Sequence, residues 1–517
     1  MFSKTRFALN IVAPGATRFV SLALTFFVTP YTVYHIGFTL YGMWALVFSS
    51  LGYVTLLELG FGTAYMRLVA DRSRPNYTAE VNGAAWALTL YNIALSGLVA
   101  AVMIPLATTL GQNVFHIDPH QLTTWRDLVG AACLYFLVST VGSMFPLTLT
   151  GLQYISELAA IDAGAQIAKA VALVLSLHFG LSIWALLVGE SCAMGIKSGL
   201  SLVLARRHIP GFRWFAQPLW WHFVRANLRF GAGMQITRLV DFVNQELDSV
   251  LIGILAGPRV VGYYQIGLKL ATLPQGLSEY VIAAFFPEAA SRLNRGDKAG
   301  AVRFYWSTLS FMIVANGFMA GGIVALAASF IPIWFRHDVP YAALVAGLIV
   351  AAYAIRQVTG PGITYLWAQG ESLWPSMFGA IGMIINVVLT VLLAWRFGFL
   401  GVIWGSAIGI SLGSLLFIAF FHRRVVRDMA GVLSLLLRTC CATVAAGLLA
   451  AILVSWTSRY GMALWRQIGG FVAGIAVYVL AFMIVSVMVS LIDYRAAIDT
   501  VRGVRQWTRN RASSRTV

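Results

Sequence analysis

Fourteen stretches of apolar residues, each long enough to cross a bilayer, constrain the fold of this chain more than any other feature. A hydrocarbon layer of about 30 Å needs roughly 20 residues of helix, which satisfies its own backbone hydrogen bonds. The composition agrees, because 59% of the residues are hydrophobic and 11% are charged. This argues against a soluble enzyme, a nucleic-acid-binding module or a disordered chain, and predicts an all-α integral membrane protein. The predicted spans are 8–34, 41–66, 83–110, 127–149, 157–178, 182–204, 229–255, 260–286, 303–331, 341–367, 373–395, 399–421, 439–457 and 468–491.

The positions of the basic residues predict the topology of these spans. With a cytoplasmic N-terminus, 24 of the 36 Lys and Arg residues fall on the inner side, six fall in outer loops and six lie within spans. Cytoplasmic loops are enriched in Lys and Arg, so we expect both ends of the chain in the cytoplasm. The net charge of +17 then needs no nucleic-acid partner. The loops are short and leave no room for an extramembrane catalytic domain.

An internal repeat is visible when the chain is displaced against itself by 220 residues. Residues 14–74 then overlie 234–294 without gaps, with nine identities over 61 positions. Six spans separate the copies, so both start on the same side of the membrane. This predicts two pseudo-symmetric six-helix lobes in a parallel repeat, as in two-lobed transporters, plus two C-terminal helices. The matched pairs include Arg18 with Arg238, Gly37 with Gly257, Gly42 with Gly262 and, with an insertion, Phe179-Gly180 with Phe397-Gly398.

The repeat and the loops divide the chain into five parts. The linker between the lobes carries Trp214, Trp220 and Trp221 among arginines, which favours an interfacial amphipathic segment, although a bland basic loop fits equally well. The parts are an N-lobe with spans 1–6 at 1–204, a cytoplasmic amphipathic linker at 205–228, a C-lobe with spans 7–12 at 229–421, spans 13 and 14 at 422–492, and a basic cytoplasmic tail at 493–517.

Ionisable residues within the spans are the candidate functional residues. Charges at bilayer depth are costly and normally face the protein interior or water. Arg and Lys suit phosphate, so the bases predict a water-filled cavity that holds an anionic head group. The alternative is that the acids and bases neutralise one another as structural ion pairs. The predicted cavity bases are Arg18, Lys169, Lys197, Arg238, Lys269 and Arg356, and the accompanying acids are Glu58, Asp162, Glu190, Asp241, Glu246, Asp248 and Glu279.

Other classes of function lack the residues that they need. A membrane-embedded glycosyltransferase would need acidic groups in an outer loop, and the first outer loop, 35–40, contains none. An acyltransferase or metalloenzyme would need paired histidines within spans, but the eight histidines lie in loops or at span ends. No phosphate-binding glycine loop is present, so ATP binding is not expected. We therefore expect no catalytic residues, no metal site and no cofactor, and a channel is less consistent with two lobes than alternating access.

Three groups of motifs resemble a known family over roughly residues 10–425. The first runs from Val33-Tyr-His-Ile-Gly through Leu57-Glu-Leu-Gly-Phe-Gly to Arg67. The second comprises Leu247-Asp248, Val261-Gly262-Tyr263-Tyr264 and Phe286-Pro287, and the third comprises Asn386 and Phe397-Gly-Phe-Leu-Gly-Val-Ile-Trp-Gly405. In order and spacing they resemble bacterial polysaccharide and oligosaccharide flippases (Wzx-type lipid-linked oligosaccharide translocases) of the multidrug/oligosaccharidyl-lipid/polysaccharide exporter superfamily.

The resemblance implies a flippase for undecaprenyl-diphosphate-linked sugar repeat units in the bacterial inner membrane, serving O-antigen, capsule or exopolysaccharide assembly. Because Arg18 and Arg238 are a repeat-related pair at bilayer depth, we expect them to hold the diphosphate, and we expect Glu58, Asp241, Asp248 or Glu190 to couple transport to a proton or sodium gradient. Membrane lipids, a polysaccharide polymerase and a chain-length regulator are the implied partners of a monomer. An ion-coupled multidrug exporter of the same superfamily is the alternative, against which the two extra spans and the intramembrane bases count.

Overall fold

The fold is all-helical, as the sequence predicts. The computed structural model describes residues 4–52, 60–215, 217–218, 220–457, 464–489 and 491, and within them it describes the surroundings of all side chains except those of 4–12, 16 and 226–245. This described part contains fifteen α-helices and no β-strand. The helices are α1 Lys4–Gly52, α2 Phe61–Ala70, α3 Tyr77–Thr109, α4 Leu122–Gly142, α5 Met144–Gly151, α6 Ile155–His178, α7 Trp184–His208, α8 Trp220–Ala271, α9 Leu273–Asn294, α10 Lys298–Phe335, α11 Ala342–Gln357, α12 Gly360–Ala368, α13 Leu373–Phe421, α14 Met429–Thr457 and α15 Leu464–Met488.

Three of the long helices are interrupted by a glycine with non-helical backbone angles. Gly37 in α1 has φ 77° and ψ 165°, and Gly257 in α8 has φ 75° and ψ 175°. Gly398 in α13 has φ 61° and ψ −142°. Residues with a Cβ rarely adopt such angles, so glycine makes the reversal of the chain possible. Eleven helices of the described chain are long and apolar enough to cross a membrane, and counting both arms of these three gives the fourteen expected spans.

Three of the spans in the described part of the chain are each broken into two helices, and two of these breaks are related by the repeat. Span 4 continues from α4 into α5, and spans 8 and 10 continue from α8 into α9 and from α11 into α12. Pro274 and Pro361 lie at the starts of α9 and α12. Proline fits the first turn of a helix but cannot continue the preceding one. Spans 4 and 10, which lie six spans apart, are therefore broken in both copies.

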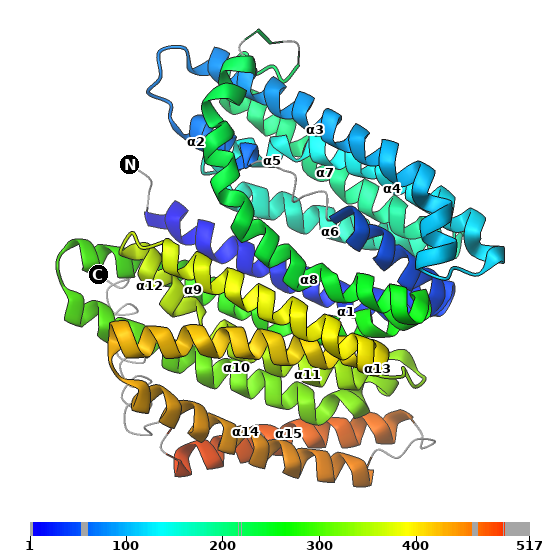
Figure 1. Cartoon of the computed structure of the whole chain (residues 1–517), viewed down its shortest axis with the longest axis vertical. Helices are drawn as coiled ribbons and strands as arrows, with labels where there is room; N and C mark the ends of the chain where they lie inside the picture. The colour runs from blue at the N-terminus through cyan, green and yellow to red at the C-terminus, as the bar shows by residue number, and fades with distance from the viewer. Residues whose placement is uncertain are drawn as a thin grey trace, which may run out of the picture. The chain divides into compact units, whose positions relative to one another are not determined.

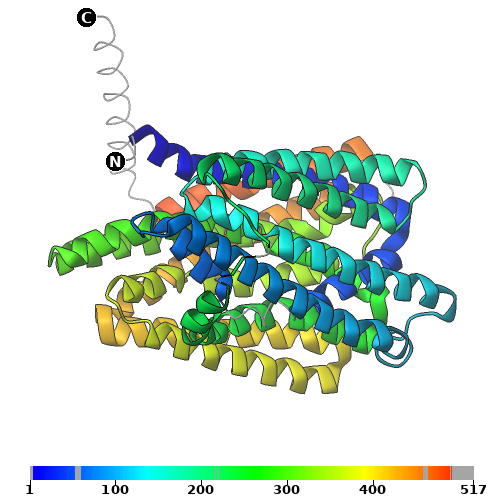
Figure 2. The same ribbon diagram turned by 90° about the horizontal axis from the view of Figure 1, so that it is seen from above.

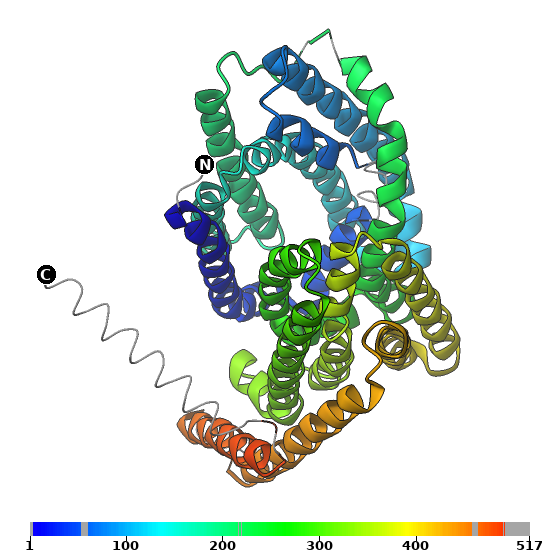
Figure 3. The same ribbon diagram turned by 90° about the vertical axis from the view of Figure 1, so that its left-hand side faces the viewer.

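The helices group into two compact units. Unit 1 comprises Met1–Ile266 and Gly379–Ser406, and unit 2 comprises Gly267–Phe378 and Ala407–Val517. In unit 1, one apolar core joins α2, α3 and α5 to the linker, and α3 and α4 run side by side from the connection at 110–121 (Figures 1 and 2). In unit 2, α14 and α15 form a hairpin against α10 (Figures 1 and 3).

The two copies of the repeat meet at a pair of glycines within unit 1. A Cβ built on Gly42 would lie 1.7 Å from the carbonyl oxygen of Pro258, and one on Gly262 would lie 2.5 Å from that of Phe38. The displacement of 220 residues relates Phe38 to Pro258 and Gly42 to Gly262. The contact of Gly42 with Pro258 is therefore the repeat-related equivalent of the contact of Gly262 with Phe38. The contact is therefore reciprocal, as a two-fold relation between the copies requires. This agrees with the parallel repeat predicted from the sequence.

Candidate functional site

A buried carboxyl group, Asp248 of α8, is the centre of a cluster of polar side chains in unit 1. Its side chain is 6% exposed. Ser406 Oγ donates a hydrogen bond of 2.5 Å to Asp248 Oδ1, and Tyr264 OH donates one of 3.2 Å to Oδ2. Thr390 Oγ1 lies 3.0 Å from Ser406 Oγ and donates to Asn386 Oδ1 at 3.2 Å. The cluster thus gathers five oxygen-bearing side chains from α8 and α13.

The glycine reversals explain how this cluster forms from distant parts of the chain. The reversal at Gly257 returns the second arm of α8 along the first, so that Tyr264 faces Asp248. The reversal at Gly398 likewise returns α13 on itself and places Ser406 beside Thr390. Gly405 permits close packing of these two arms, because its Cβ would lie 2.4 Å from the Cα of Thr390. In each hairpin, a hydrogen bond therefore joins the two arms: Tyr264 with Asp248 in α8, and Ser406 with Thr390 in α13.

The environment of Asp248 suits a group that exchanges a proton or a cation. Two hydroxyl groups donate to its carboxyl oxygens, and no described Lys, Arg or His forms an ion pair with it. Burying a carboxyl group in its charged form is costly. Binding of a proton or of a small cation removes that cost. Hydroxyl, amide and carboxylate oxygens are also the ligand types that hard cations prefer.

Four of the predicted intramembrane charges form two ion pairs between α6 and α7. Lys169 pairs with Glu190, and Lys197 Nζ lies 2.8 Å from Asp162 Oδ1. These side chains are 29–40% exposed, so the pairs are accessible rather than sealed in the core. Asp162 and Lys169 lie seven residues, or two turns, apart on α6, as do Glu190 and Lys197 on α7, so each pair lies on one helical face, and the structure brings these two faces together. For these four residues, the contacts are those of the alternative stated above, in which intramembrane acids and bases neutralise one another as structural ion pairs.

The other predicted site residues are distributed over both units. Arg18 in unit 1 is exposed, and the neighbouring Thr17 ties α1 to α6 by donating a hydrogen bond of 2.7 Å to the carbonyl oxygen of Ala159. Lys269 and Arg356 belong to unit 2 and are half-buried. Glu58 and the side chains of Arg238 and Asp241 lie outside the described residues. The diphosphate-binding role predicted for Arg18 and Arg238 therefore stays a prediction.

Several polar partners were not among the sequence-based candidates. Ser406, Thr390 and Tyr264 surround Asp248, and Ser49 Oγ donates a hydrogen bond of 2.5 Å to Glu246 Oε2 between α1 and α8. Single hydroxyl groups in apolar helices give no sequence signal, because most of them bond to the preceding turn of their own helix. The glycine reversal at Gly257 is the signal that could have found Tyr264, because it returns the second arm of α8 along Asp248.

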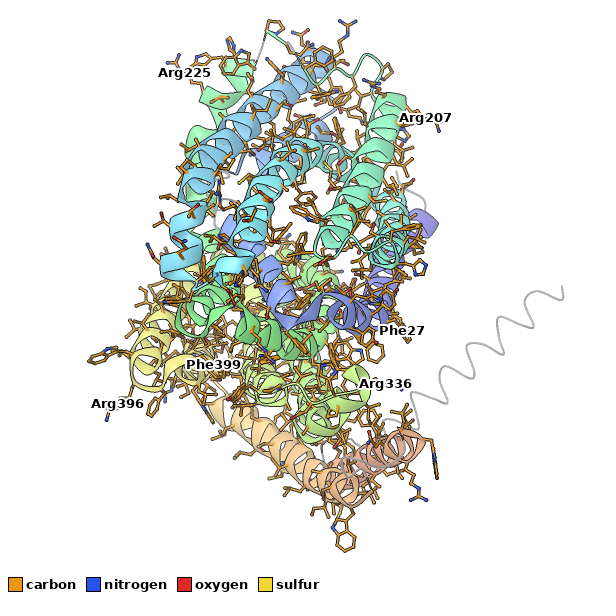
Figure 4. All side chains as sticks on the ribbon, turned by 90° about the vertical axis from the view of Figure 1, so that its right-hand side faces the viewer. Phe27, Arg207, Arg225, Arg336, Arg396 and Phe399 are labelled. Carbon is orange, nitrogen blue, oxygen red and sulfur yellow. The ribbon has the colours of Figure 1, made fainter. Side chains whose placement is uncertain are left out.

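The linker before α8 is anchored to the N-terminal end of α3. The Asn82 side chain donates to the carbonyl oxygen of Gly211 at 2.9 Å and accepts from the backbone N–H of Arg213 at 2.9 Å. The ring of Trp214 packs edge-on against Phe145. Arg207 and Arg225, on either side, point away from the ribbon (Figure 4). Phe212 is buried and Trp214 half-buried here, whereas Phe215 and Trp221 are exposed like these arginines, so the interfacial role of the linker stays a prediction.

Comparisons with known proteins agree with this arrangement. A family model described as "Polysaccharide biosynthesis protein" matches residues 10–291. The lipopolysaccharide biosynthesis protein WzxC of Escherichia coli (strain K12) is 24% identical over 338 residues, which are 63% of this chain and 63% of that relative. The aligned stretch thus spans less than two thirds of the relative's own length.

Two solved structures illustrate the likeness of fold. The lipid II flippase MurJ in an inward closed conformation has a TM-score of 0.67 at 14% identity, over 94% of this chain and 100% of that chain. An inward-facing multidrug resistance MATE family transporter of the MOP superfamily has a TM-score of 0.61 at 12% identity, over 79% of this chain and 96% of that chain. At these identities the likeness concerns the fold.

The described fold and these likenesses define a multi-pass helical membrane protein with the two-lobed architecture of flippases and multidrug transporters. The family model matches more than half of the chain. The chain belongs to the polysaccharide biosynthesis protein family.

Proposed function

We propose that the protein is a flippase of the multidrug/oligosaccharidyl-lipid/polysaccharide exporter superfamily that moves undecaprenyl-diphosphate-linked oligosaccharide repeat units across the inner membrane by alternating access. The observation that carries this proposal is membership of a polysaccharide biosynthesis family combined with the fold of flippases and transporters. The product would serve O-antigen, capsule or exopolysaccharide assembly. This is transport rather than enzymatic catalysis, and it involves no covalent change in the cargo.

The cargo explains why basic residues occur at bilayer depth. A diphosphate carries its negative charge through a low-dielectric layer, where arginine offers planar bidentate hydrogen bonds and lysine a compact positive charge. We assign the diphosphate to Arg18 and Arg238, and we place Lys169, Lys197, Lys269 and Arg356 along the route of the head group. The sugars would travel in water and the polyprenyl tail would stay in lipid.

Asp248 is the strongest candidate for coupling to an ion gradient. It lies buried among hydroxyl groups on arms that reverse at Gly257 and Gly398, so its occupancy by a proton or sodium ion would alter the packing of both hairpins. Glu58, Asp241 and Glu190 are the further coupling candidates. In the bacterial inner membrane, with both termini in the cytoplasm, the ion would move with its gradient. A polysaccharide polymerase and a chain-length regulator would act on the exported units.

A deletion strain tests the proposed function directly. Without the protein, lipid-linked repeat units should accumulate on the cytoplasmic side while the later polymer disappears, and the full-length gene should restore it. Intact surface polysaccharide in the deletion strain would contradict the proposal.

The alternative, an ion-coupled multidrug exporter, is favoured by the multidrug transporters that share the fold. This alternative predicts a different phenotype in the deletion strain, in drug sensitivity rather than in polysaccharide. Sensitivity to cationic dyes with unchanged polysaccharide would support it.

A further inference from the structure

The two ion pairs between α6 and α7 form a regular structure, which we call the charge ladder: Asp162, Lys169, Glu190 and Lys197. The helices are joined by a turn at Phe179–Gly180. Lys169 and Glu190 lie ten residues to either side of that turn, and Asp162 and Lys197 lie seventeen residues to either side. Antiparallel helices bring together positions at equal distances from their connection. The order of charges, acid then base along each helix, therefore makes both rungs attractive.

The charge ladder lies deep within the membrane-spanning helices. Each of its four residues is at least six residues from the nearer end of α6 or α7, which corresponds to about 9 Å of helix. The rungs are two helical turns apart, or about 10 Å. The Lys197 side chain is 40% exposed and the other three are 29% exposed. Charges at this depth avoid hydrocarbon, so this exposed face suits water.

We propose that Asp162 and Glu190 set the affinity of this face for the anionic head of the cargo, because they compete with it for Lys169 and Lys197. The inference rests on the flippase function proposed above. With both acids charged, the four side chains carry no net charge, and an arriving diphosphate must draw each lysine away from its carboxylate. The acids thus keep binding weak enough for release on the far side. A transport pathway requires such reversible binding, because cargo held too tightly cannot leave.

The expected size of the effect follows from the charges. A carboxylate about 7 Å from a bound phosphate, in a hydrated site of intermediate dielectric constant, weakens binding about three- to tenfold. Replacing Glu190 by Gln or Asp162 by Asn removes that repulsion and keeps the shape of the side chain. Replacing Lys169 or Lys197 by Gln removes an attraction of similar size. The acid and base variants should therefore shift the affinity in opposite directions.

The experiment measures binding of farnesyl diphosphate, a short polyprenyl diphosphate, to the purified full-length protein in detergent, with farnesol as the uncharged reference. Glu190→Gln and Asp162→Asn should each lower the dissociation constant about three- to tenfold, and Lys169→Gln should raise it. Glu80→Gln is the matched control, because it also removes the acid of an ion pair, but one away from the charge ladder. Glu80, in the first turn of α3, lies 2.8 Å from Arg74 in the loop between α2 and α3. In cells, the two acid variants should export less polysaccharide despite binding more tightly.

The outcomes separate this inference from the proposed function. If the wild-type protein prefers the diphosphate to farnesol but both acid variants bind it no more tightly than wild type, the competition idea is wrong and the flippase proposal stands. If the wild-type protein binds both compounds equally, the diphosphate cargo itself is wrong, and the inference falls with it. Two acid variants on different helices guard against a local folding defect in either.

Discussion

A single methyl group added at Gly42 or Gly262 should destabilise the contact between the two copies of the repeat. In Gly262→Ala the new Cβ would lie 2.5 Å from the carbonyl oxygen of Phe38, and in Gly42→Ala it would lie 1.7 Å from that of Pro258. Both neighbours are backbone atoms next to a glycine reversal, so no side chain can rotate away. The two helical arms themselves must separate.

The expected loss of stability follows from how far the two helical arms must move apart. Restoring ordinary van der Waals contact requires a shift of about 1 Å for Gly262→Ala and nearly twice that for Gly42→Ala. Forcing an extra methyl group into a packed site costs about 1–3 kcal/mol, and we expect the larger shift at or above the upper end. Alanine also gains up to about 1 kcal/mol of helix propensity over glycine, which a control variant must reproduce.

Gly97→Ala provides that control, because Gly97 lies within α3 with no atom within 4 Å of its added Cβ. Thermal unfolding of the three purified variants in the same detergent gives the comparison. The unfolding temperature should fall in the order Gly97→Ala, Gly262→Ala, Gly42→Ala. If Gly42→Ala unfolds at the temperature of the control, the arms do not approach as described and the reciprocal contact is wrong.

Three further predictions concern the charged groups. Asp248→Asn should leave the protein folded but make transport independent of the ion gradient. Asp248→Leu should in addition destabilise the protein by about 1–3 kcal/mol for each hydroxyl group left without an acceptor. Gradient-dependent transport by the Asn variant would exclude Asp248 as the coupling group. Arg18→Ala combined with Arg238→Ala should abolish surface polysaccharide at normal protein levels in the membrane, and normal polymer would eliminate the diphosphate assignment. Hydrogen bonds from Ser73 and Arg74 lower the pKa of Asp71 in the loop between α2 and α3, so the stabilisation that these bonds give the loop is fully present above about pH 4 and is lost as the pH falls through the lowered pKa. Protection of the amides of 71–77, measured relative to their intrinsic exchange rates, that stays unchanged on acidification would contradict it.

The fold was largely predictable because its determinants are local. The length of apolar stretches fixes the spans, and the basic loops predict which ends share a side of the membrane. The identity of Gly37 with Gly257 after a displacement of 220 residues predicts the repeat, and both glycines adopt nearly the same reversed conformation. The sequence predicts the spans as separate helices. In the structure, three pairs of consecutive spans are joined directly, with one non-helical glycine as the connection.

The candidate site was less predictable because it depends on contacts between distant residues. The sequence identifies Asp248 as a costly intramembrane acid, but the shorter of its two hydrogen bonds described above comes from Ser406, 158 residues later. No local pattern distinguishes that serine from others in apolar helices. The pairing of Lys169 with Glu190 is different, because equal distances from the Phe179–Gly180 turn make it derivable from the sequence. Periodicity along each helix identified the faces, and only the register across the turn identifies the partners.

The most direct test of the proposed function is reconstitution. The purified protein is placed in liposomes that contain a fluorescent undecaprenyl-diphosphate-linked oligosaccharide, and a membrane-impermeant reagent then quenches the label in the outer leaflet. We predict that an ion gradient makes the protected inner-leaflet fraction accessible in liposomes with the protein but not in empty ones, and that Arg18→Ala with Arg238→Ala removes this access. Equal protection with and without the protein would contradict the account.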